Sequence, residues 1–370
     1  VRIATGPGGA GGGNITWQAG APIDYSGSTG TLTLDASGYI TLNSNITTGT
    51  GGLTLQAGAG YVEAAPGVTL ALGGPLNVST GDITIGTAGF ASPELAATLT
   101  GTGPLTKTGT GRLILSGNSN TWSGTTNVQA GTLRVSGANA LGTSASTKVL
   151  SGATLEIDGG ISLAENIELN SGSTLLNWSG DNTITLPLLL RDNGSRVVDV
   201  RQDSLTLHPT AGKAVDADNN VVAHLTFAGS GDLVVQGIFD LDNGQAPATY
   251  GDFLQTGTGV ARFKQSMIVD EVESNGGGTI WMDQPGGLPV SLPSTTSISL
   301  DNGSILRRDS SETVTGASLS LGAGGGGISV GNGFTLVWNS PITGAGTFTK
   351  AGDGTLRFPS TAAINYTGAT

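Results

Sequence analysis

Very short alternating runs of apolar and polar residues recur along the whole chain, and they limit its fold more than any other feature. Each run is bounded by Gly, Asn, Asp or Ser. Alternation with a period of two predicts β-strands with one buried face, and no sustained stripe with helical spacing occurs. The sequence therefore predicts an all-β fold, built from strands such as residues 31–34, 39–42, 154–157, 204–207 and 334–338.

Strands this short cannot bury a sandwich core alone, but they can when equivalent strands of successive coils stack. Glycine, present 63 times in 370 residues, and asparagine both allow the positive φ angles of tight corners. We expect a right-handed parallel β-helix (β-solenoid) with some protruding loops. Coils of about 20–25 residues give about 15 to 18 rungs. A pair of Greek-key or jelly-roll β-domains is the alternative, and the sustained glycine content with few charges favours the β-helix.

One sequence frame occurs twice, at residues 101–115 and 344–358. Both copies fit G-x-G-x-[LF]-T-K-x-G-x-G-x-L-x-[LF], so Lys107 and Lys350 are equivalent. The first copy continues to Trp122 in an N-x-W-x-G corner, and the second continues to Tyr366. We expect structural roles for these four residues. The lysines would be outward turn residues whose stems cover apolar surface, and the aromatic residues would cap corners between adjacent rungs. A charged contact between the lysines and a ligand is the alternative.

This frame resembles the autotransporter-associated β-strand repeat, whose pattern is G-x-L-x-K-x-G-x-G-x-L-x-L-S-G-x-N-x-[YW]-x-G. Residues 12–86 resemble the repeats of filamentous-haemagglutinin-like exoproteins, through segments such as T-L-T-L-D-A-S-G-Y-I and G-L-T-L-Q-A-G. The resemblance is strong over residues 12–86, 101–142 and 343–370, and weak from about 187 to 315. It implies a β-helical stalk of a large secreted bacterial adhesin, exported by an autotransporter or a two-partner route.

The chain is predicted to be one continuous solenoid with four segments. Residues 1–100 contain haemagglutinin-like rungs, and residues 101–186 contain the first repeat copy. Residues 187–315 contain irregular rungs with longer loops, and residues 316–370 contain the second copy. The chain begins with Val1 and stops inside the second copy, so we expect a fragment truncated at both ends.

Charge and cysteine content disfavour several classes of function. The net charge of −12 disfavours nucleic acid as a partner, because binding phosphates needs basic patches. The absence of cysteine removes disulfide scaffolds, thiol nucleophiles and cysteine-bound metals. The two histidines, His208 and His224, leave little material for imidazole catalysis. No apolar run approaches the roughly 20 residues of a membrane span, so we expect no membrane insertion of this segment.

Acidic residues gather at residues 199–203, 216–220, 240–244 and 270–273. Asp216, Asp218 and Asn220 offer the oxygen ligands that calcium prefers, although their run does not fit an EF-hand loop. Asx turns at solenoid corners are the favoured explanation of the same residues. These three residues are therefore our calcium candidate, and we expect no other cofactor.

Exposed aromatic rings are the side chains on which sugars stack. Trp178 and Trp281 lie outside the repeat and among polar neighbours. We name these two residues as candidates for a carbohydrate contact.

Taken together, these features predict a non-enzymatic adhesin segment on the bacterial cell surface. It would mediate cell–cell or cell–surface adhesion and biofilm formation. The expected partners are extracellular polysaccharide or a host surface glycan or protein, and an outer-membrane transporter or anchor. Two alternatives stay open: a polysaccharide lyase or glycoside hydrolase on the same scaffold, and an inert stalk with recognition elsewhere in the protein.

Overall fold

The structure is a computed structural model that describes residues 1–6, 13–58, 60–80, 95–143, 146–218, 221–241, 251–283 and 297–369. Within these ranges every regular element is a β-strand, and the strand pairings are parallel. No helix in the same ranges is long and apolar enough to cross a membrane. The strands stack into a β-solenoid, which confirms the predicted all-β, parallel β-helical fold.

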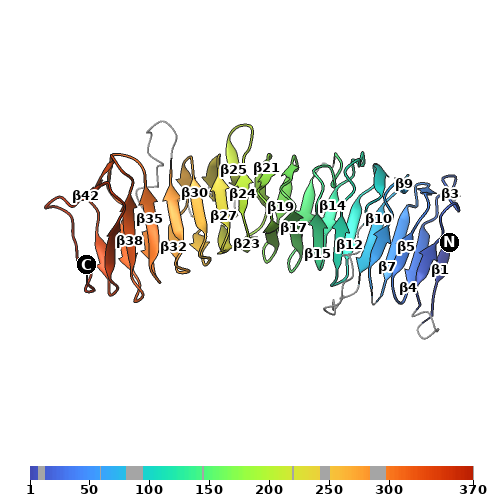
Figure 1. Cartoon of the computed structure of the whole chain (residues 1–370), viewed down its shortest axis with the longest axis horizontal. Helices are drawn as coiled ribbons and strands as arrows, with labels where there is room; N and C mark the ends of the chain where they lie inside the picture. Colours follow the sequence, from blue (N-terminus) through green and yellow to red (C-terminus); the bar gives the residue numbers. More distant parts are fainter. Residues whose placement is uncertain are drawn as a thin grey trace. The chain divides into compact units, whose positions relative to one another are not determined.

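The chain divides into two compact units, Val1–Leu175 and Leu176–Thr370. The boundary falls inside β20 (Thr174–Ser179). Within each unit, strands of successive coils lie side by side (Figure 1). The finer division into four segments stays a prediction.

The strands of unit 1 form sheets that run along its stack of coils. Sheet A contains, in order, β1 (Arg2–Ala4), β4 (Leu32–Ala36), β7 (Leu53–Ala57), β10 (Leu76–Thr80), β12 (Leu105–Thr108), β14 (Thr126–Val128), β16 (Thr147–Val149) and β19 (Ile167–Leu169). Other paired strands are β2 (Ile15–Trp17), β5 (Ile40–Leu42) and β8 (Val62–Ala64); β3 (Ile23–Tyr25), β6 (Ile46–Thr48), β9 (Thr69–Leu72) and β11 (Thr98–Gly101); and β13 (Arg112–Leu115), β15 (Thr132–Val135) and β17 (Thr154–Asp158). The short strand β18 (Ser162–Leu163) completes the unit.

Unit 2 is built in the same way. Sheet B contains, in order, β23 (Gly194–Val200), β26 (Ala223–Gly229), β29 (Phe253–Gln255), β32 (Glu271–Ser274), β34 (Ser297–Leu300), β37 (Ser318–Leu321) and β40 (Ile342–Gly344). Sheet D contains β21 (Asn182–Ile184), β24 (Ser204–Leu207), β27 (Asp232–Val235), β30 (Val260–Phe263), β33 (Thr279–Met282), β35 (Ser304–Arg308), β38 (Gly326–Val330) and β41 (Phe348–Ala351). The remaining strands are β22 (Leu188–Leu190), β25 (Lys213–Ala217), β28 (Ile238–Asp240) and β31 (Met267–Ile268), and β36 (Glu312–Val314), β39 (Thr335–Trp338) and β42 (Thr355–Arg357).

The core is a set of side-chain columns, each contributed by successive coils. In sheet A the register pairs Leu34 with Leu55 and Leu55 with Val78, and all three side chains are fully buried. The alternating Thr and Asn residues face outward. Burying one aliphatic side chain contributes roughly 1.5–3 kcal/mol. A coil therefore becomes stable through the coils stacked on it rather than by itself.

The predicted coil length of about 20–25 residues holds in part of the chain only. In unit 1, Leu105 pairs with Thr126 and Thr126 with Thr147, so these coils have the expected length. In unit 2, Arg196 pairs with Leu225 and Leu225 with Phe253, so these coils are longer than expected. The parallel pairings of the described residues nevertheless connect about 16 levels, from β2 through the bridges at Leu95 to β40 and Ile364, in agreement with the predicted 15 to 18 rungs.

The longer coils of unit 2 bury phenylalanine rings. Phe239, Phe253 and Phe263 are fully buried and meet edge to face, with ring centroids 5.2 to 5.5 Å apart. This geometry is favourable for aromatic pairs. The rings fill the interior beneath the part of sheet B that carries the hollow described next.

Candidate functional site

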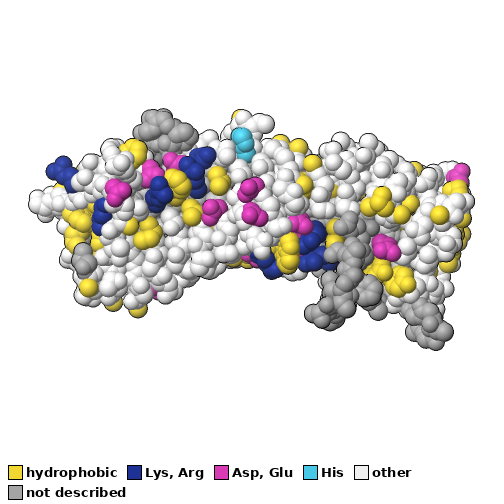
Figure 2. Space-filling model, in the orientation of Figure 1, with side chains coloured by type: hydrophobic (Ala, Val, Ile, Leu, Met, Phe, Trp, Pro, Cys, Tyr) yellow, Lys and Arg dark blue, Asp and Glu magenta, His cyan; other side chains and the backbone are white. Residues whose placement is uncertain are grey.

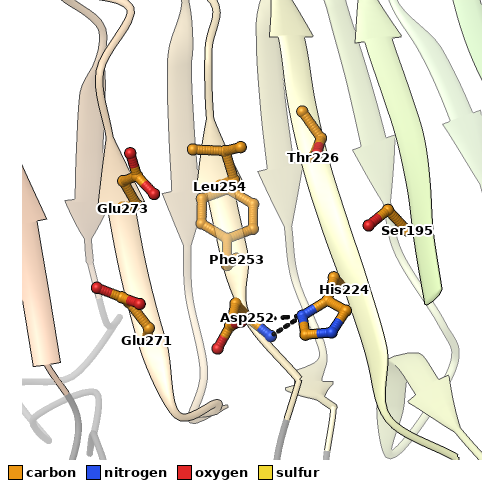
Figure 3. Close-up of a pocket in the computed structure, with 8 residues that line it drawn as sticks. All are labelled: Ser195, His224, Thr226, Asp252, Phe253, Leu254, Glu271 and Glu273. Atoms are coloured by element: carbon orange, nitrogen blue, oxygen red, sulfur yellow. Dashed lines mark hydrogen bonds and ion pairs between the residues drawn. The ribbon is translucent and has the colours of Figure 1, made fainter. Parts of the chain in front are cut away.

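A hollow of about 300 Å³ lies on the outward face of sheet B in unit 2. Strands β23, β26, β29 and β32, with the residue that precedes β29, provide its side chains (Figure 3). It is lined by Ser195, His224, Thr226, Asp252, Phe253, Leu254, Glu271 and Glu273. Hydroxyl, imidazole and carboxylate groups therefore meet in this hollow.

The parallel register brings these residues together although they come from four successive coils. Ser195 pairs with His224. The adjacent pairs Leu225–Phe253 and Phe253–Val272 extend the same column to the residues before them, Asp252 and Glu271. Every second residue faces outward, so Thr226, Leu254 and Glu273 form a second outward column. Between the columns the inward side chains are fully buried, which fixes the position of the outward ones.

His224 is oriented by Asp252. The backbone N–H of Asp252 donates to His224 Nδ1 at 3.1 Å, and Asp252 Oδ2 lies 2.9 Å from the same nitrogen. The amide bond needs a bare Nδ1, which places the proton of the neutral imidazole on Nε2. His224 Nε2 is therefore the hydrogen-bond donor of the ring.

The carboxylates of the hollow crowd one another. Burial, followed by the negative charges of Asp252 and Glu273, raises the pKa of Glu271, while a hydrogen bond from Ser297 opposes the rise. Glu273 accepts a hydrogen bond from the Asn275 side chain at 3.0 Å. Among the described residues, no Lys or Arg forms an ion pair with any of the three carboxylates. The hollow therefore combines hydrogen-bond donors with uncompensated negative charge.

The structure places Trp281, a predicted sugar contact, on sheet D rather than at the hollow. The register sets Arg262 and Arg307 on the strands to either side of it, and each guanidinium carbon lies 3.9 Å from the ring centroid. Asp283 and Asp309 bind these two arginines. A sugar could stack on Trp281 only after displacing a guanidinium. The carbohydrate role of Trp281 stays a prediction.

Trp178, the second predicted sugar contact, lies on β20. The Arg201 guanidinium carbon is 5.0 Å from its ring centroid, and Arg201 also pairs with Asp199 at 3.2 Å. A cation over an indole is a stabilising contact. Neither tryptophan lines the hollow.

The calcium candidates have cationic partners. Asp216 Oδ1 lies 2.6 Å from Lys213 Nζ, and Asp218 pairs with Arg191. Asn220 lies outside the described residues. Within the described ranges, no group of three or more His, Asp and Glu side chains is placed to hold a metal ion. The calcium site stays a prediction that these ion pairs do not favour.

Lys107 does not point outward, and the expectation that it would is wrong. Its side chain is fully buried in sheet A, in the column between Val78 and Val128. Its Nζ donates to the carbonyl oxygens of Thr108, Gly109 and Ala130 at 2.7, 3.0 and 3.2 Å. Burial lowers the pKa of Lys107 to about 8. The ring of carbonyls explains why a lysine can occupy an apolar column.

The other repeat residues lie at the corners and at the last coils. Trp122 is buried, and its Nε1–H donates to the Gly103 carbonyl of the preceding coil at 2.8 Å. Lys350 is exposed, and its Nζ donates to the Gly352 carbonyl. The ring of Tyr366 lies 5.7 Å from that of Phe348.

The hollow was not predicted from the sequence. In the sequence His224 is a lone histidine, and residues 270–273 are a separate acidic run. The usable signal was the outward position of each residue in an alternating strand. Whether outward residues of successive coils lie next to one another depends on the length of the loops between their strands. No sequence motif predicts those lengths.

Two segments of the chain, residues 105–135 and 348–370, match the family model of the passenger-associated transport repeat. They overlap the two copies of the frame that contains Lys107 and Lys350. Over these two segments the chain is similar to a repeat of autotransporter passenger domains. No curated protein and no solved structure matches the chain.

Proposed function

We propose that this chain is part of a secreted bacterial adhesin. Its β-helix acts as a rigid stalk on the cell surface, and the hollow of unit 2 binds extracellular polysaccharide during cell–cell or cell–surface adhesion and biofilm formation. The observation that carries this proposal is the hollow itself, a cluster of hydroxyl, imidazole and carboxylate groups on a passenger-type solenoid.

The chemistry of the hollow suits a sugar polymer. Ser195 and Thr226 supply hydroxyl groups, His224 supplies a donor at Nε2, and the carboxylates accept hydrogen bonds from sugar hydroxyls. Leu254 adds an apolar contact for the carbon face of a sugar ring. Charged side chains occupy only a small part of the face displayed in Figure 2.

The partners follow from this role. We propose an outer-membrane transporter or anchor as the export partner, by either an autotransporter or a filamentous-haemagglutinin-like two-partner route. A host surface glycan or protein is the alternative ligand to an exopolysaccharide. Figure 1 shows the stack of coils of unit 2, which would present the ligand site.

Retention of the purified chain on immobilised bacterial exopolysaccharides and host glycans tests the proposal. We expect saturable retention on at least one polymer, with retention reduced about tenfold or more in a Ser195→Ala, Thr226→Ala double variant. Thr206→Ala is the matched control, since Thr206 faces outward on β24 of sheet D. No retention on any polymer would overturn the proposal and favour an inert stalk with recognition elsewhere.

A glycoside hydrolase is the second candidate, and the pKa of Glu271 favours it. Glycosidases pair a carboxylic acid of raised pKa with a second, ionised carboxylate. Glu271 with Asp252 or Glu273 has this character. Release of reducing ends from a bound polymer, and its loss in Glu271→Gln, would replace the stalk proposal with catalysis. Retention without release would leave binding as the function.

A further inference from the structure

The polar groups of the hollow include several without a protein partner. The hydroxyls of Ser195 and Thr226 and the Nε2 of His224 form no hydrogen bond with any described residue, whereas His224 Nδ1 is held by Asp252. These three donors lie on β23 and β26, on one side of the hollow, and Glu271 and Glu273 lie on β32 on the other (Figure 3). A ligand in the hollow would therefore meet donors on one side and acceptors on the other.

Carboxylates on the neighbouring sheet D have arginine partners, unlike those of the hollow. On sheet D, Asp283 pairs with Arg262 and Asp309 with Arg307. At the hollow, Asp252 has only the imidazole of His224, and no cation is paired with Glu271 or Glu273 among the described residues. A positive charge supplied by the ligand would relieve the repulsion between these carboxylates.

The two outward columns continue past the hollow as hydroxyl groups. Glu271 pairs with Ser297 and Ser297 with Ser318, while Glu273 pairs with Ser299 and Ser299 with Ser320. Strands in a sheet are about 4.8 Å apart, so the columns form a regular track across β32, β34 and β37. A linear polymer lying on this track would meet serine hydroxyls before it reaches the carboxylates.

We propose that the hollow selects an amine-bearing glycan, a polymer of amino sugars in which some units carry a free protonated amine instead of an acetamide. This inference rests on the proposed polysaccharide binding and names its ligand class. The ammonium group lies against Asp252, Glu271 and Glu273. The ring hydroxyls bind the donors of Ser195, His224 and Thr226, and the next sugars lie along the serine track.

The test compares two oligomers of equal length, one of glucosamine and one of N-acetylglucosamine, by calorimetry with the full chain at about pH 6. The two ligands share a backbone and differ in the charge of the nitrogen substituent. We expect the glucosamine oligomer to bind about tenfold tighter or more, and added salt to weaken its binding selectively. The Glu271→Gln, Glu273→Gln double variant, which keeps only the Asp252 carboxylate, should lose most of this preference, while Thr206→Ala should keep the wild-type preference.

Each contrary result has a distinct meaning. Equal or tighter binding of the acetylated oligomer by the wild type would overturn the amine selectivity and leave polysaccharide binding intact. An undiminished preference in the double variant would place the selectivity outside these two carboxylates and also overturn the inference. Binding of neither oligomer would overturn it too, and the retention panel would then decide whether the proposed function also fails. Circular dichroism of the double variant confirms that its β-structure is retained.

Discussion

The two copies of the repeat frame share a sequence pattern but differ in environment. Lys107 is fully buried, and its Nζ donates to three carbonyls, one of which belongs to Ala130 in the following coil. Lys350 is exposed, and its Nζ donates to Gly352 in its own coil. Sheet A continues from β12 to β14, whereas β41 is the last strand of sheet D among the described residues.

The difference shows where the environment of a residue comes from in a solenoid. Local geometry is the same in both copies: Gly109 and Gly352, which follow each lysine at the same spacing, have positive φ angles of 74° and 70°. Such angles favour glycine. The burial and the third acceptor come from the next coil, so the same motif is a core element in one place and a surface element in the other.

Removing the lysine side chain should give the largest difference in stability loss between the two copies of the frame. Lys107→Ala leaves the carbonyls of Thr108, Gly109 and Ala130 without their donor and opens a cavity, which should destabilise the chain by about 3 kcal/mol. Lys350→Ala should cost less than about 0.5 kcal/mol. Urea unfolding midpoints measure both changes. Equal effects would show that the following coil does not create the environment of Lys107.

Glycine substitutions should affect the two copies of the frame alike, because in both copies the atoms that a new Cβ would meet belong to the preceding coil. A Cβ at Gly124 would clash with the Gly103 carbonyl oxygen, and one at Gly368 would clash with the Gly346 carbonyl oxygen. Gly124→Ala should destabilise by about 1–3 kcal/mol. Gly368→Ala should speed hydrogen exchange at the Phe348 amide, which donates to Ala369. Gly27→Ala has open space around its Cβ and should change neither quantity.

Trp122→Phe sharpens the comparison at the corner of the first copy. The substitution removes the bond from Nε1 to the Gly103 carbonyl and keeps most of the buried aromatic area. The expected loss is about 1 kcal/mol, measured as a shift of the urea midpoint at unchanged slope. A larger loss accompanied by a changed slope would mean that the corner itself unfolds.

The smallest predicted effect is the change that Lys107 causes in the free energy of unfolding as pH varies. The folded pKa of Lys107 is about 8, below its ordinary value of 10.5. The unfolded chain therefore holds the proton more tightly, and stability should rise as pH increases through 8. The gain between pH 8 and 9 is at most about 1 kcal/mol. Lys107→Met should lack this rise, and an identical pH profile for the two proteins would contradict the assignment.

Much of the fold was predictable because its signals are local. Alternation of period two predicts short strands, and glycine-rich corners predict coils that stack. The recurrence of the frame predicts that Lys107 and Lys350 are equivalent. The direction of Lys107 was not predictable from hydrophobicity, because three backbone carbonyls, which no side-chain pattern encodes, satisfy its ammonium group.

The candidate site was the less predictable part, because it depends on register between coils of unequal length. A long coil separates His224 from its partner Ser195, but a much shorter one separates Val272 from Phe253. The same irregularity brings Arg262 and Arg307 to either side of Trp281. A change of one residue in a loop would move each side chain to the opposite face of its strand.

The central claim is that recognition lies in the hollow of unit 2 while the remaining coils serve as a stalk. Hydrogen exchange of the full chain, with and without the polysaccharide that retains it, tests this claim most directly. We predict that added protection is confined to the peptides of β23, β26, β29, β32 and the adjoining β34 and β37. Protection centred on unit 1, or on sheet D around Trp281, would contradict the claim.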